Sequence, residues 1–382
     1  MLARGRSQRR VRAPGPQGQG PFMPGGECKL MATPSGRGGK VRRLTRMAKG
    51  LEAGQTSRLP AGDTADGQSA LLVRRVKRQF LGLALILVVW LGAVPCPGYA
   101  DIFRVATYNV ENYLDEPTYT RPHVKSPEAR AKVREGIRAM NPDVLALEEM
   151  GTTNALLELR ASLRAEGLDF PYWEHVSGFD TNIHVAILSK FPITARRPHT
   201  NESFLLDGRS FQVSRGFAEV DIQAGTNFSF TVIAAHLKSK RPVPEADEAE
   251  QRLGEATELR GIIDERLHAD PELPLIVLGD MNDVKDAAST RELMGRGKYR
   301  LVDTRPAERN GDNTPGTSAR VEPRDITWTD YFAKEDSYSR IDYILLSPAM
   351  AEHWVPKETY VLALPNWGVG SDHRPIVAGF EK

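Results

Sequence analysis

The sequence predicts one α/β domain with large sheets, beginning at residue 101. Short apolar runs alternate with segments that carry an apolar stripe at helical spacing, and no internal repeat or linker-like break follows residue 101. The composition, 40% hydrophobic and 26% charged over 382 residues, is that of a globular protein. Alternating strands and helices over such a length favour an α/β layer architecture.

Two helices and three strands are expected in the first half of this domain. Ser126 followed by Pro127 is typical of a helix start, and apolar residues then recur every three or four positions up to Met140. A second helix is expected after Thr152 or Thr153, either of which can cap it. Apolar or alternating runs predict strands at residues 102–107, 144–147 and 184–188.

The second half contains the longest predicted helix and most of the predicted strands. Residues 245–268 form this helix, with Ala249, Leu253, Ala256 and Ile263 expected to face inward and many charges outward. Further strands are expected at residues 217–222, 228–235, 275–278, 326–332, 341–346 and 376–380.

Charge is distributed unevenly along the chain. Residues 1–79 contain 17 Lys+Arg and four Asp+Glu, a net charge of +13. Subtraction from the totals of 51 and 49 leaves 34 and 45, a net charge of −11, for residues 80–382. An acidic body argues against non-specific clamping of nucleic acid by bulk charge. It is compatible with a metal-dependent site, because a bound cation supplies positive charge locally.

The first hundred residues resemble a leader rather than part of a fold. Residues 1–79, rich in Gly, Pro, Arg and Ser, are expected to be disordered. A basic patch, the uncharged run 80–94 and small residues before a cut after Ala100 predict a signal peptide over 80–100, and hence export to the periplasm or the exterior. The alternative is an uncleaved anchor formed by the same uncharged run. Because a signal so far from the N-terminus is abnormal, we hypothesise that translation starts further in, at Met47.

Both cysteines, Cys28 and Cys96, precede the predicted domain. Residues 101–382 therefore contain no disulfide, no zinc–thiolate site and no cysteine nucleophile.

Polar side chains gather where five of the predicted strands end or begin. One such residue is ordinary turn chemistry, but five groups together indicate a functional site. Carboxylates and an amide without cysteine predict a site for a hard cation, Mg²⁺ with Mn²⁺ as the alternative, and the absence of a His-Glu-x-x-His motif argues against zinc. Histidines beside aspartates favour hydrolysis of a phosphate ester. The groups are Asn109, Glu148 with Glu149, His236, Asp280 with Asn282, and Asp372 with His373.

Six short motifs occur in an order that resembles one known family. They are Thr107-Tyr108-Asn109-Val110-Glu111-Asn112, Leu145-Ala146-Leu147-Glu148-Glu149, Ala235-His236-Leu237, Gly279-Asp280-Met281-Asn282, Arg340-Ile341-Asp342-Tyr343 and Ser371-Asp372-His373. This order is similar to that of the endonuclease/exonuclease/phosphatase superfamily, which includes deoxyribonucleases, apurinic endonucleases, inositol-phosphate 5-phosphatases and bacterial sphingomyelinases. The resemblance covers residues 102–382 and implies a four-layer α/β/β/α sandwich with two packed mixed sheets, formed by residues 101–382.

The resemblance also implies roles for individual residues. The implied metal-side residues are Asn109, Glu149 and Asp372. Glu148 stands where the family has Gln, which leaves open which glutamate holds the metal. The implied catalytic residues are Asp280 and Asn282 for the water and the phosphate, His373 with its orienting partner Asp342, and His236 for the phosphate or leaving group. Phosphate contacts are expected from Arg215, by a looser match, and from Lys238 in the basic run after His236.

These observations predict a secreted, metal-dependent phosphodiesterase that acts on DNA or RNA. Residues 236–240, His-Leu-Lys-Ser-Lys, resemble the same place in bacterial extracellular nucleases. One alternative is a lipid or small-molecule phosphodiesterase or phosphatase. The sequence shows no obvious exposed aromatic hairpin for binding lipid, which argues against a lipid substrate. Another is a non-catalytic secreted binding domain. Nucleic acid is the expected partner, with no protein partner and no stable membrane association after cleavage.

Overall fold

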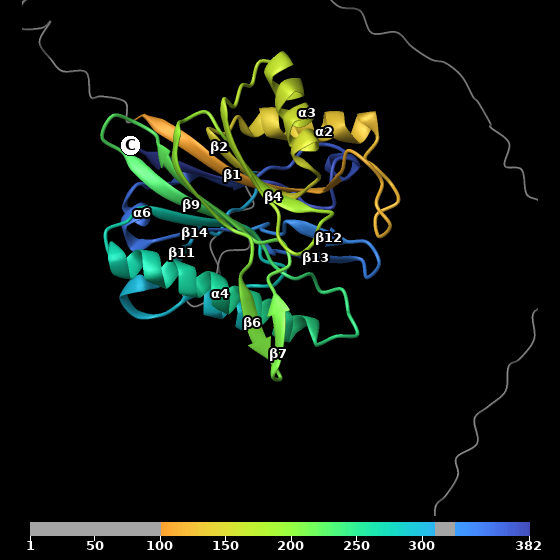
Figure 1. Ribbon diagram of the computed structural model, residues 1–382. Helices are drawn as coiled ribbons and strands as arrows, with labels where there is room; N and C mark the ends of the chain where they lie inside the picture. Colours follow the sequence, from red (N-terminus) through yellow and green to blue (C-terminus); the bar gives the residue numbers. More distant parts are fainter. Residues whose placement is uncertain (1–100, 310–324) are drawn as a thin grey trace, which may run out of the picture. The chain divides into compact units, whose positions relative to one another are not determined.

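The computed structural model describes residues 101–309 and 325–382. The predicted leader and signal peptide, residues 1–79 and 80–100, lie outside the described residues. In the described part, two six-stranded sheets pack face to face between outer layers of helices (Figure 1). The predicted α/β class and its four-layer arrangement are therefore confirmed. None of the helices within these ranges is long and apolar enough to cross a membrane.

The first sheet has β1 near its centre. In spatial order it consists of β15 (Trp354–Val361), β16 (Ile376–Glu381), β1 (Ile102–Tyr113), β2 (Val144–Met150), β4 (His184–Ser189) and β3 (Tyr172–Val176). Strand β1 runs parallel to β2 and antiparallel to β16. It extends well beyond the predicted end at residue 107, because its motif residues continue the strand.

The second sheet brings together the strands that carry most of the predicted catalytic residues. In spatial order it consists of β11 (Val302–Asp303), β14 (Asp342–Leu346), β10 (Leu275–Asp280), β9 (Ser229–His236), β8 (Phe217–Gln223) and β5 (Ile193–His199). Strand β10 is parallel to β9 and antiparallel to β14. This register places Asp280 directly opposite both His236 and Asp342.

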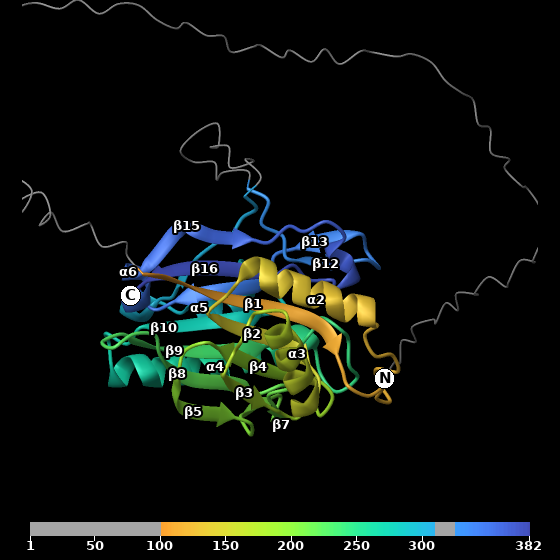
Figure 2. The same ribbon diagram turned by 90° about the horizontal axis from the view of Figure 1, so that it is seen from above.

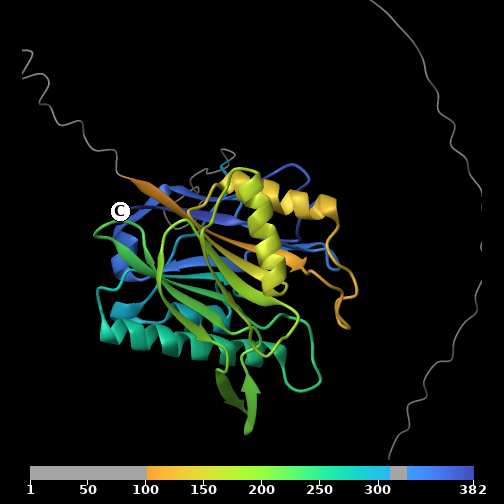
Figure 3. The ribbon, with the colours of Figure 1, turned by 45° about the horizontal axis from the view of Figure 1, so that its top comes forward.

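Two hairpins stand outside the main sheets. They are β6 (Ser203–Leu206) with β7 (Arg209–Gln212), which extends beside α4 (Figure 3), and β12 (Asp330–Phe332) with β13 (Ser337–Ser339). The predicted strand 326–332 is thus wrong over its first half: only its last three residues pair, in the second hairpin. That hairpin exposes Phe332 and Tyr338, so the sequence-based view that the domain lacks an aromatic hairpin is also wrong.

Helices α2 (Pro127–Met140) and α3 (Thr153–Ala165) cover the first sheet (Figure 2). As predicted, Ser126 caps α2, its hydroxyl accepting a hydrogen bond from the Ala129 amide at 3.2 Å. The hydroxyl of Thr152 caps α3 in the same way. The short helical segments are α5 (Ala288–Met294), α6 (Pro348–Glu352), η1 (Gly297–Tyr299) and η2 (Trp367–Val369).

Helix α4 (Glu248–Ala269) covers the second sheet, but its buried face differs from the prediction. Ala256 and Ile263 are buried as expected, whereas Ala249 is exposed and Leu253 is half-buried. Polar residues take part of the inward face instead: Gln251, Arg252, Glu255 and Arg260 are buried. They bond to neighbouring loops, an arrangement that a purely apolar helical pattern does not reveal.

Three apolar clusters hold the layers together, one between each pair of adjacent layers. The cluster between the two sheets contains residues such as Phe103, Val220 and Ile276, all essentially inaccessible to solvent. The other two join α2 and α3 to the first sheet and α4 to the second. Full burial of each large aliphatic or aromatic side chain stabilises the fold by about 1.5–3 kcal/mol. This packing fixes the strand ends from which the polar groups emerge.

Candidate active site

The predicted site residues meet at one end of the sandwich, where strands of both sheets end or begin. Strands β1, β2, β9 and β10 end there, and β14 and β16 begin there. The β12–β13 hairpin lies at the same end (Figure 1), because Asp330 pairs with His373 through an isolated backbone bridge. Side chains from distant parts of the sequence are thereby brought together at this end of the sandwich.

Asp280, His373 and Asp342 form the centre of this group. The Nδ1 atom of His373 is hydrogen-bonded to Asp342 Oδ2 at 2.9 Å, and its Nε2 atom lies 3.8 Å from Asp280 Oδ2. All three side chains are buried. Asp342 therefore fixes the orientation of the imidazole ring, with Nε2 facing Asp280.

Three more predicted residues surround Asp280. The side-chain amide of Asn109 donates to Asp280 Oδ2 at 3.0 Å, and the backbone amide of Asn282 donates to Asp280 Oδ1 at 2.9 Å. His236 Nε2 lies 3.5 Å from Asp280 Oδ2, while its Nδ1 atom has no hydrogen-bond partner among the described residues. Asn282 has a positive φ of 54°, so a tight backbone turn aims its side chain back at Asp280. The Asp280 carboxylate is the hub of the cluster.

Burial and unbalanced charge shift the titration of these groups. Burial raises the pKa of Asp280 to about 7, with a further rise from Asp342 and opposition from His373. Burial alone would lower the pKa of His373, but Asp342 and Asp280 raise it well above its ordinary value. Burial, with Arg215 and His373 adding to the effect, lowers the pKa of His236 well below its ordinary value. At neutral pH the site holds a protonated His373 and a neutral His236.

Glu148 and Glu149 point in different directions although they are adjacent in β2. Glu148 is fully buried, accepts a hydrogen bond from the Thr107 hydroxyl at 2.7 Å, and leaves its Oε2 atom without a partner among the described residues. Burial raises the pKa of Glu148 well above its ordinary value. Glu149 is only half-buried and has a positive φ of 60°. Glu149 is thus more accessible to an ion than Glu148.

A glycine allows this close packing behind the site. Gly279 has a φ of +131°, and a Cβ atom there would lie 1.9 Å from the carbonyl oxygen of Ala235. The same atom would lie 3.1 Å from Glu148 Oε1. No other residue type fits between β9 and the buried glutamate, so the Gly-Asp pair is required by the packing as well as by the chemistry.

Two of the predicted metal-side residues, Glu149 and Asp372, lie with Glu111 in a second, more open group of carboxylates around Lys125. Asn112 donates its backbone amide to Glu149 Oε2 at 2.9 Å, and Asp372 is about half-exposed, with 48% of its side chain accessible. Burial raises the pKa of Glu111 in this group, and Asp372 and Glu149 raise it further. Lys125 is 3.7 Å from Glu111. Three carboxylates are therefore balanced by one nearby ammonium group, that of Lys125. This excess of negatively charged oxygens fits a hard divalent cation.

Asp330 is a member of the site that the sequence analysis did not identify. Its Oδ1 atom lies 3.8 Å from His373 Nε2, and burial raises its pKa. Asp330, Asp372 and His373 could together hold a metal ion, as could Asp280, Asp342 and His373. Asp330 stands in a three-residue strand without a recognisable motif, and only the hairpin geometry brings it to His373. The one available signal was an acidic residue beside an aromatic run.

The two predicted phosphate-binding residues, Arg215 and Lys238, lie near His236. Arg215 is buried, donates to the carbonyl of Leu237 at 3.1 Å, and leaves its Nε atom without a hydrogen bond among the described residues. Its Nε atom is 3.8 Å from Asp180. The ammonium group of Lys238 instead donates to carbonyls of its own loop, those of Ser239 and Arg241, at 3.1 and 3.0 Å. Arg215 is therefore the better placed of the two to meet an anion.

The comparison with family models matches residues 106–373 to the model described as "Endonuclease/Exonuclease/phosphatase family". Among curated proteins, no sequence matches this chain significantly.

Several solved structures share the fold. A variant of beta toxin from Staphylococcus aureus with bound magnesium ions has a TM-score of 0.51 at 18% identity, covering 73% of this chain and 99% of the toxin. The human Nocturnin catalytic domain scores 0.51 at 15% identity, with 73% and 94% covered. Sphingomyelinase C from Streptomyces griseocarneus scores 0.50 at 19% identity, with 73% and 99% covered.

Proposed function

The chain belongs to the endonuclease/exonuclease/phosphatase family, and on that premise we propose that it is a secreted, divalent-metal-dependent phosphodiesterase that cleaves nucleic acid. The family fold is that of a phosphoesterase, and its members are generally hydrolytic. The observation that carries the proposal is the buried Asp280 carboxylate, which contacts Asn109 and Asn282 and faces His373 and His236. A buried acid whose pKa is near neutrality, next to an oriented histidine, is a group suited to acid–base catalysis.

Glu149, Asp372 and Asn109 are the proposed ligand residues for Mg²⁺, with Mn²⁺ as the alternative ion. The donor set is made of carboxylate and amide oxygens without sulfur, as hard cations prefer. Members of this family depend on divalent metals, and the beta toxin variant contains bound magnesium ions. A bound Mg²⁺ would polarise the phosphate and offset negative charge on its oxygens. In the described structure, the Asn109 amide is bonded to Asp280, so this residue joins the two groups of oxygens.

Asp280 and the residues around it have separate roles in the proposed reaction. Asp280 orients a water molecule and accepts its proton, since its raised pKa makes it a base near neutral pH. Asn282 and the neutral His236 donate hydrogen bonds to the phosphate. Protonated His373, held by Asp342, directs its Nε2–H at a phosphate oxygen and stabilises the charge that develops there. Arg215 supplies a buried positive charge beside His236.

A lipid substrate is the second candidate, and one observation favours it. The β12–β13 hairpin beside His373 exposes Phe332 and Tyr338, and Sphingomyelinase C shares the fold. The turn between these two residues nevertheless carries Lys334, Glu335 and Asp336, and charged turns enter a bilayer poorly. The basic run after His236 supports nucleic acid as the substrate.

The proposal includes export through the signal at residues 80–100, which lie outside the described structure. Cleavage after Ala100 would release a protein that begins at Asp101, the residue directly before β1. Mass spectrometry of the exported form tests this, and a membrane-retained protein that keeps residues 80–94 would support the anchor alternative.

One assay tests the function. The purified protein with Mg²⁺ is offered plasmid DNA, RNA, sphingomyelin and bis-p-nitrophenyl phosphate, with Asp280→Asn as the control. Cleavage of the nucleic acids and the small diester, abolished by chelation and by Asp280→Asn, supports the proposal. Cleavage of sphingomyelin alone supports the lipid candidate, and no turnover by a folded protein supports a binding domain.

A further inference from the structure

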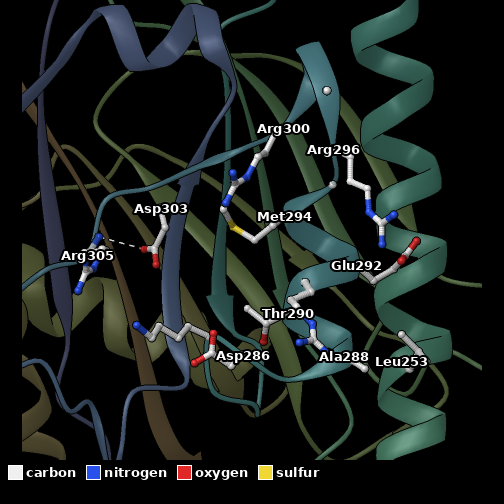
Figure 4. Close-up of a pocket in the computed structure, with 14 residues that line it drawn as sticks. Leu253, Asp286, Ala288, Thr290, Glu292, Met294, Arg296, Arg300, Asp303 and Arg305 are labelled. Atoms are coloured by element: carbon white, nitrogen blue, oxygen red, sulfur yellow. Dashed lines mark hydrogen bonds between the residues drawn. The ribbon is translucent and has the colours of Figure 1, made fainter. Parts of the chain in front are cut away.

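A large open pocket lies outside the candidate active site, on the flank of the second sheet. It has a volume of about 760 Å³ and is bounded by α5, η1, the loop before α5 and residues 303–305 (Figure 4). None of the predicted catalytic or metal-side residues lines it. We call it the basic pocket, because five of its lining residues are Lys285, Arg291, Arg296, Arg300 and Arg305.

The charges of the basic pocket are only partly balanced within it. Its acidic lining residues are Asp286, Glu292 and Asp303, and Asp303 is already paired with Arg340 at 2.6 Å. The guanidinium groups of Arg291, Arg296 and Arg300 form no ion pair or hydrogen bond with any described residue. Most other arginines of the described chain, such as Arg252 and Arg260, are paired.

Three neighbouring unpaired arginines, Arg291, Arg296 and Arg300, are unusual for this protein, because residues 80–382 carry a net charge of −11 by the subtraction given above. The arginines of the basic pocket are exposed to solvent and stand around a cavity rather than along a flat surface. Guanidinium groups bind phosphate through paired, planar hydrogen bonds. The pocket thus offers an anion a local field opposite in sign to that of the surrounding body.

The basic pocket is joined to the candidate active site by a short, well-anchored loop. Lys285 follows Asn282 by three residues, which limits the distance between their Cα atoms to about 11 Å. Asp283, between them, holds the loop in place: its carboxylate accepts hydrogen bonds from Arg252 and Ser289, both at 2.9 Å. Its carbonyl accepts one from the Tyr343 hydroxyl at 3.0 Å.

The opposite wall of the basic pocket is tied to the site as well. Arg340, which pairs with Asp303, stands two residues before Asp342, the partner of His373. Both sides of the pocket are therefore connected to the catalytic group, one through the loop 282–285 and the other through the Asp303–Arg340 ion pair. The basic pocket and the catalytic group are therefore neighbours along two segments of the chain, residues 282–285 and 340–342.

We propose that the basic pocket binds the phosphodiester backbone of a nucleic-acid strand whose scissile phosphate lies in the active site. Arg291, Arg296 and Arg300 contact successive phosphates beyond the one that is cleaved. This inference rests on the proposed function and deepens it, because it makes a polynucleotide, rather than a small diester, the preferred substrate. The pocket contributes affinity and position without reading sequence.

The test replaces the three arginines together and separates binding from turnover. Arg291→Ala/Arg296→Ala/Arg300→Ala is compared with Arg138→Ala/Arg164→Ala/Arg196→Ala, which removes the same charge from α2, α3 and β5, elements outside the pocket. The full chain is assayed on a single-stranded oligonucleotide and on bis-p-nitrophenyl phosphate over a range of salt concentrations. Binding of the same labelled oligonucleotide is measured separately with EDTA present, so that no cleavage occurs.

The pocket variant is expected to lose about tenfold in the ratio of kcat/KM for the oligonucleotide to that for the small diester at low salt. The log–log salt dependence of binding becomes shallower by about 2, because each phosphate of a single strand that the protein neutralises contributes about 0.7 to the slope. The control variant keeps the ratio and the slope, and an all-lysine version of the pocket variant restores most of the slope.

Other results overturn the inference in distinguishable ways. Equal ratios and slopes in the pocket and control variants show that the arginines do not contact the strand. Loss of binding to phosphatidylserine vesicles, with oligonucleotide binding intact, identifies the pocket as a membrane contact instead. If the wild-type protein cleaves nothing but the pocket variant still loses oligonucleotide binding, the proposed function fails, the link to a scissile phosphate falls with it, and only backbone binding by the pocket is supported.

Discussion

Two clusters of charged side chains in this protein differ in how their charges are balanced. The active-site cluster contains the acids Asp280, Asp342, Asp330 and Asp372 around His373. The other cluster, which we call the β5–β8 network, joins two acids of β8 to cations of β5 and α4. Its members are Glu219 and Asp221, with Arg197, His199 and Arg266.

The titration of the acids follows this difference in balance. In the active-site cluster, burial raises the pKa of Asp280 and of Asp330, and too few cations are present to reverse the rise. In the β5–β8 network, burial acts in the same direction, but His199 and Arg197 lower the pKa of Glu219 below its ordinary value. The network stabilises the fold, whereas the active-site cluster keeps an unfavourable arrangement that a cation or a substrate can relieve.

The largest expected effect comes from removing the two central groups of the active-site cluster. Asp280→Asn and His373→Ala should each lower turnover on a phosphodiester by about 10²–10⁴-fold, the usual contribution of an acid–base group. Because the cluster contains more carboxylates than cations, Asp280→Asn should leave the free energy of unfolding unchanged or raise it. Turnover at saturating Mg²⁺ and chemical denaturation measure the two quantities.

Two further variants test whether Asp280 and His373 act together and whether Asp342 orients His373. The double variant should lose much less than the product of the single losses, since both groups act on one reaction. Asp342→Asn should reproduce part of the His373 loss, because it removes the acceptor that orients the ring at 2.9 Å. Near-wild-type turnover by a folded His373→Ala protein would overturn the mechanism.

The next largest effect is expected in the β5–β8 network, and on stability instead of activity. Glu219→Gln should lower the free energy of unfolding by about 3 kcal/mol, because breaking a buried ion pair leaves its partners uncompensated. The Glu219 side chain is only 1% exposed and faces Arg197, His199 and Arg266. Activity per folded molecule should be retained. A stable but inactive Glu219→Gln protein would contradict the division between the two clusters.

The sequence revealed most of the active-site cluster but none of the β5–β8 network. Asp280 and His236 follow apolar strands, so the pattern itself predicts that they emerge at a sheet edge. Asp330 was missed because its approach to His373 depends on a hairpin that pairs only three residues on each side. The network was missed because the cations of β5, such as Arg197 and His199, look like an exposed surface until β8 and α4 pack against them.

The buried face of α4 was missed for a related reason. Glu255 is fully inside, yet it accepts hydrogen bonds from Ser214 and from the backbone amide of Lys238. A helical pattern assigns such a residue to solvent, since only its loop partners make its burial tolerable. Local patterns thus predicted the elements and motifs, while contacts between loops and helices required the structure.

A smaller effect is expected from the two adjacent glutamates of β2. Glu149→Gln should raise the Mg²⁺ concentration needed for half-maximal activity by at least about tenfold, because the site loses a charged ligand. Glu148→Gln should change it little, since Glu148 is fully buried against Thr107 and the amide has nearly the same shape. Magnesium titrations of both variants measure this. Equal or reversed effects would show that Glu149 has been wrongly chosen over Glu148 as the metal ligand.

The smallest expected effect is a pH dependence in the β5–β8 network. His199 is hydrogen-bonded to Glu219 at 2.9 Å and to Glu202 at 3.2 Å, and these contacts raise its pKa above the ordinary value of 6.5. A raised folded-state pKa means that the folded protein binds the proton more tightly than the unfolded chain does. The stabilisation is therefore complete below pH 6.5 and is lost as the pH rises through the folded-state pKa.

His199→Gln isolates this contribution, because glutamine can keep a hydrogen bond but cannot become charged. The wild-type protein should exceed the variant in free energy of unfolding by about 1 kcal/mol or less near pH 5.5, as for a partly exposed ion pair. The difference should shrink as the pH rises to 9. Denaturation series at several pH values measure it, with Glu219→Gln/His199→Gln as the control that removes the coupling. A difference that grows with pH would mean that His199 is held neutral and that the network is not the balanced cluster described above.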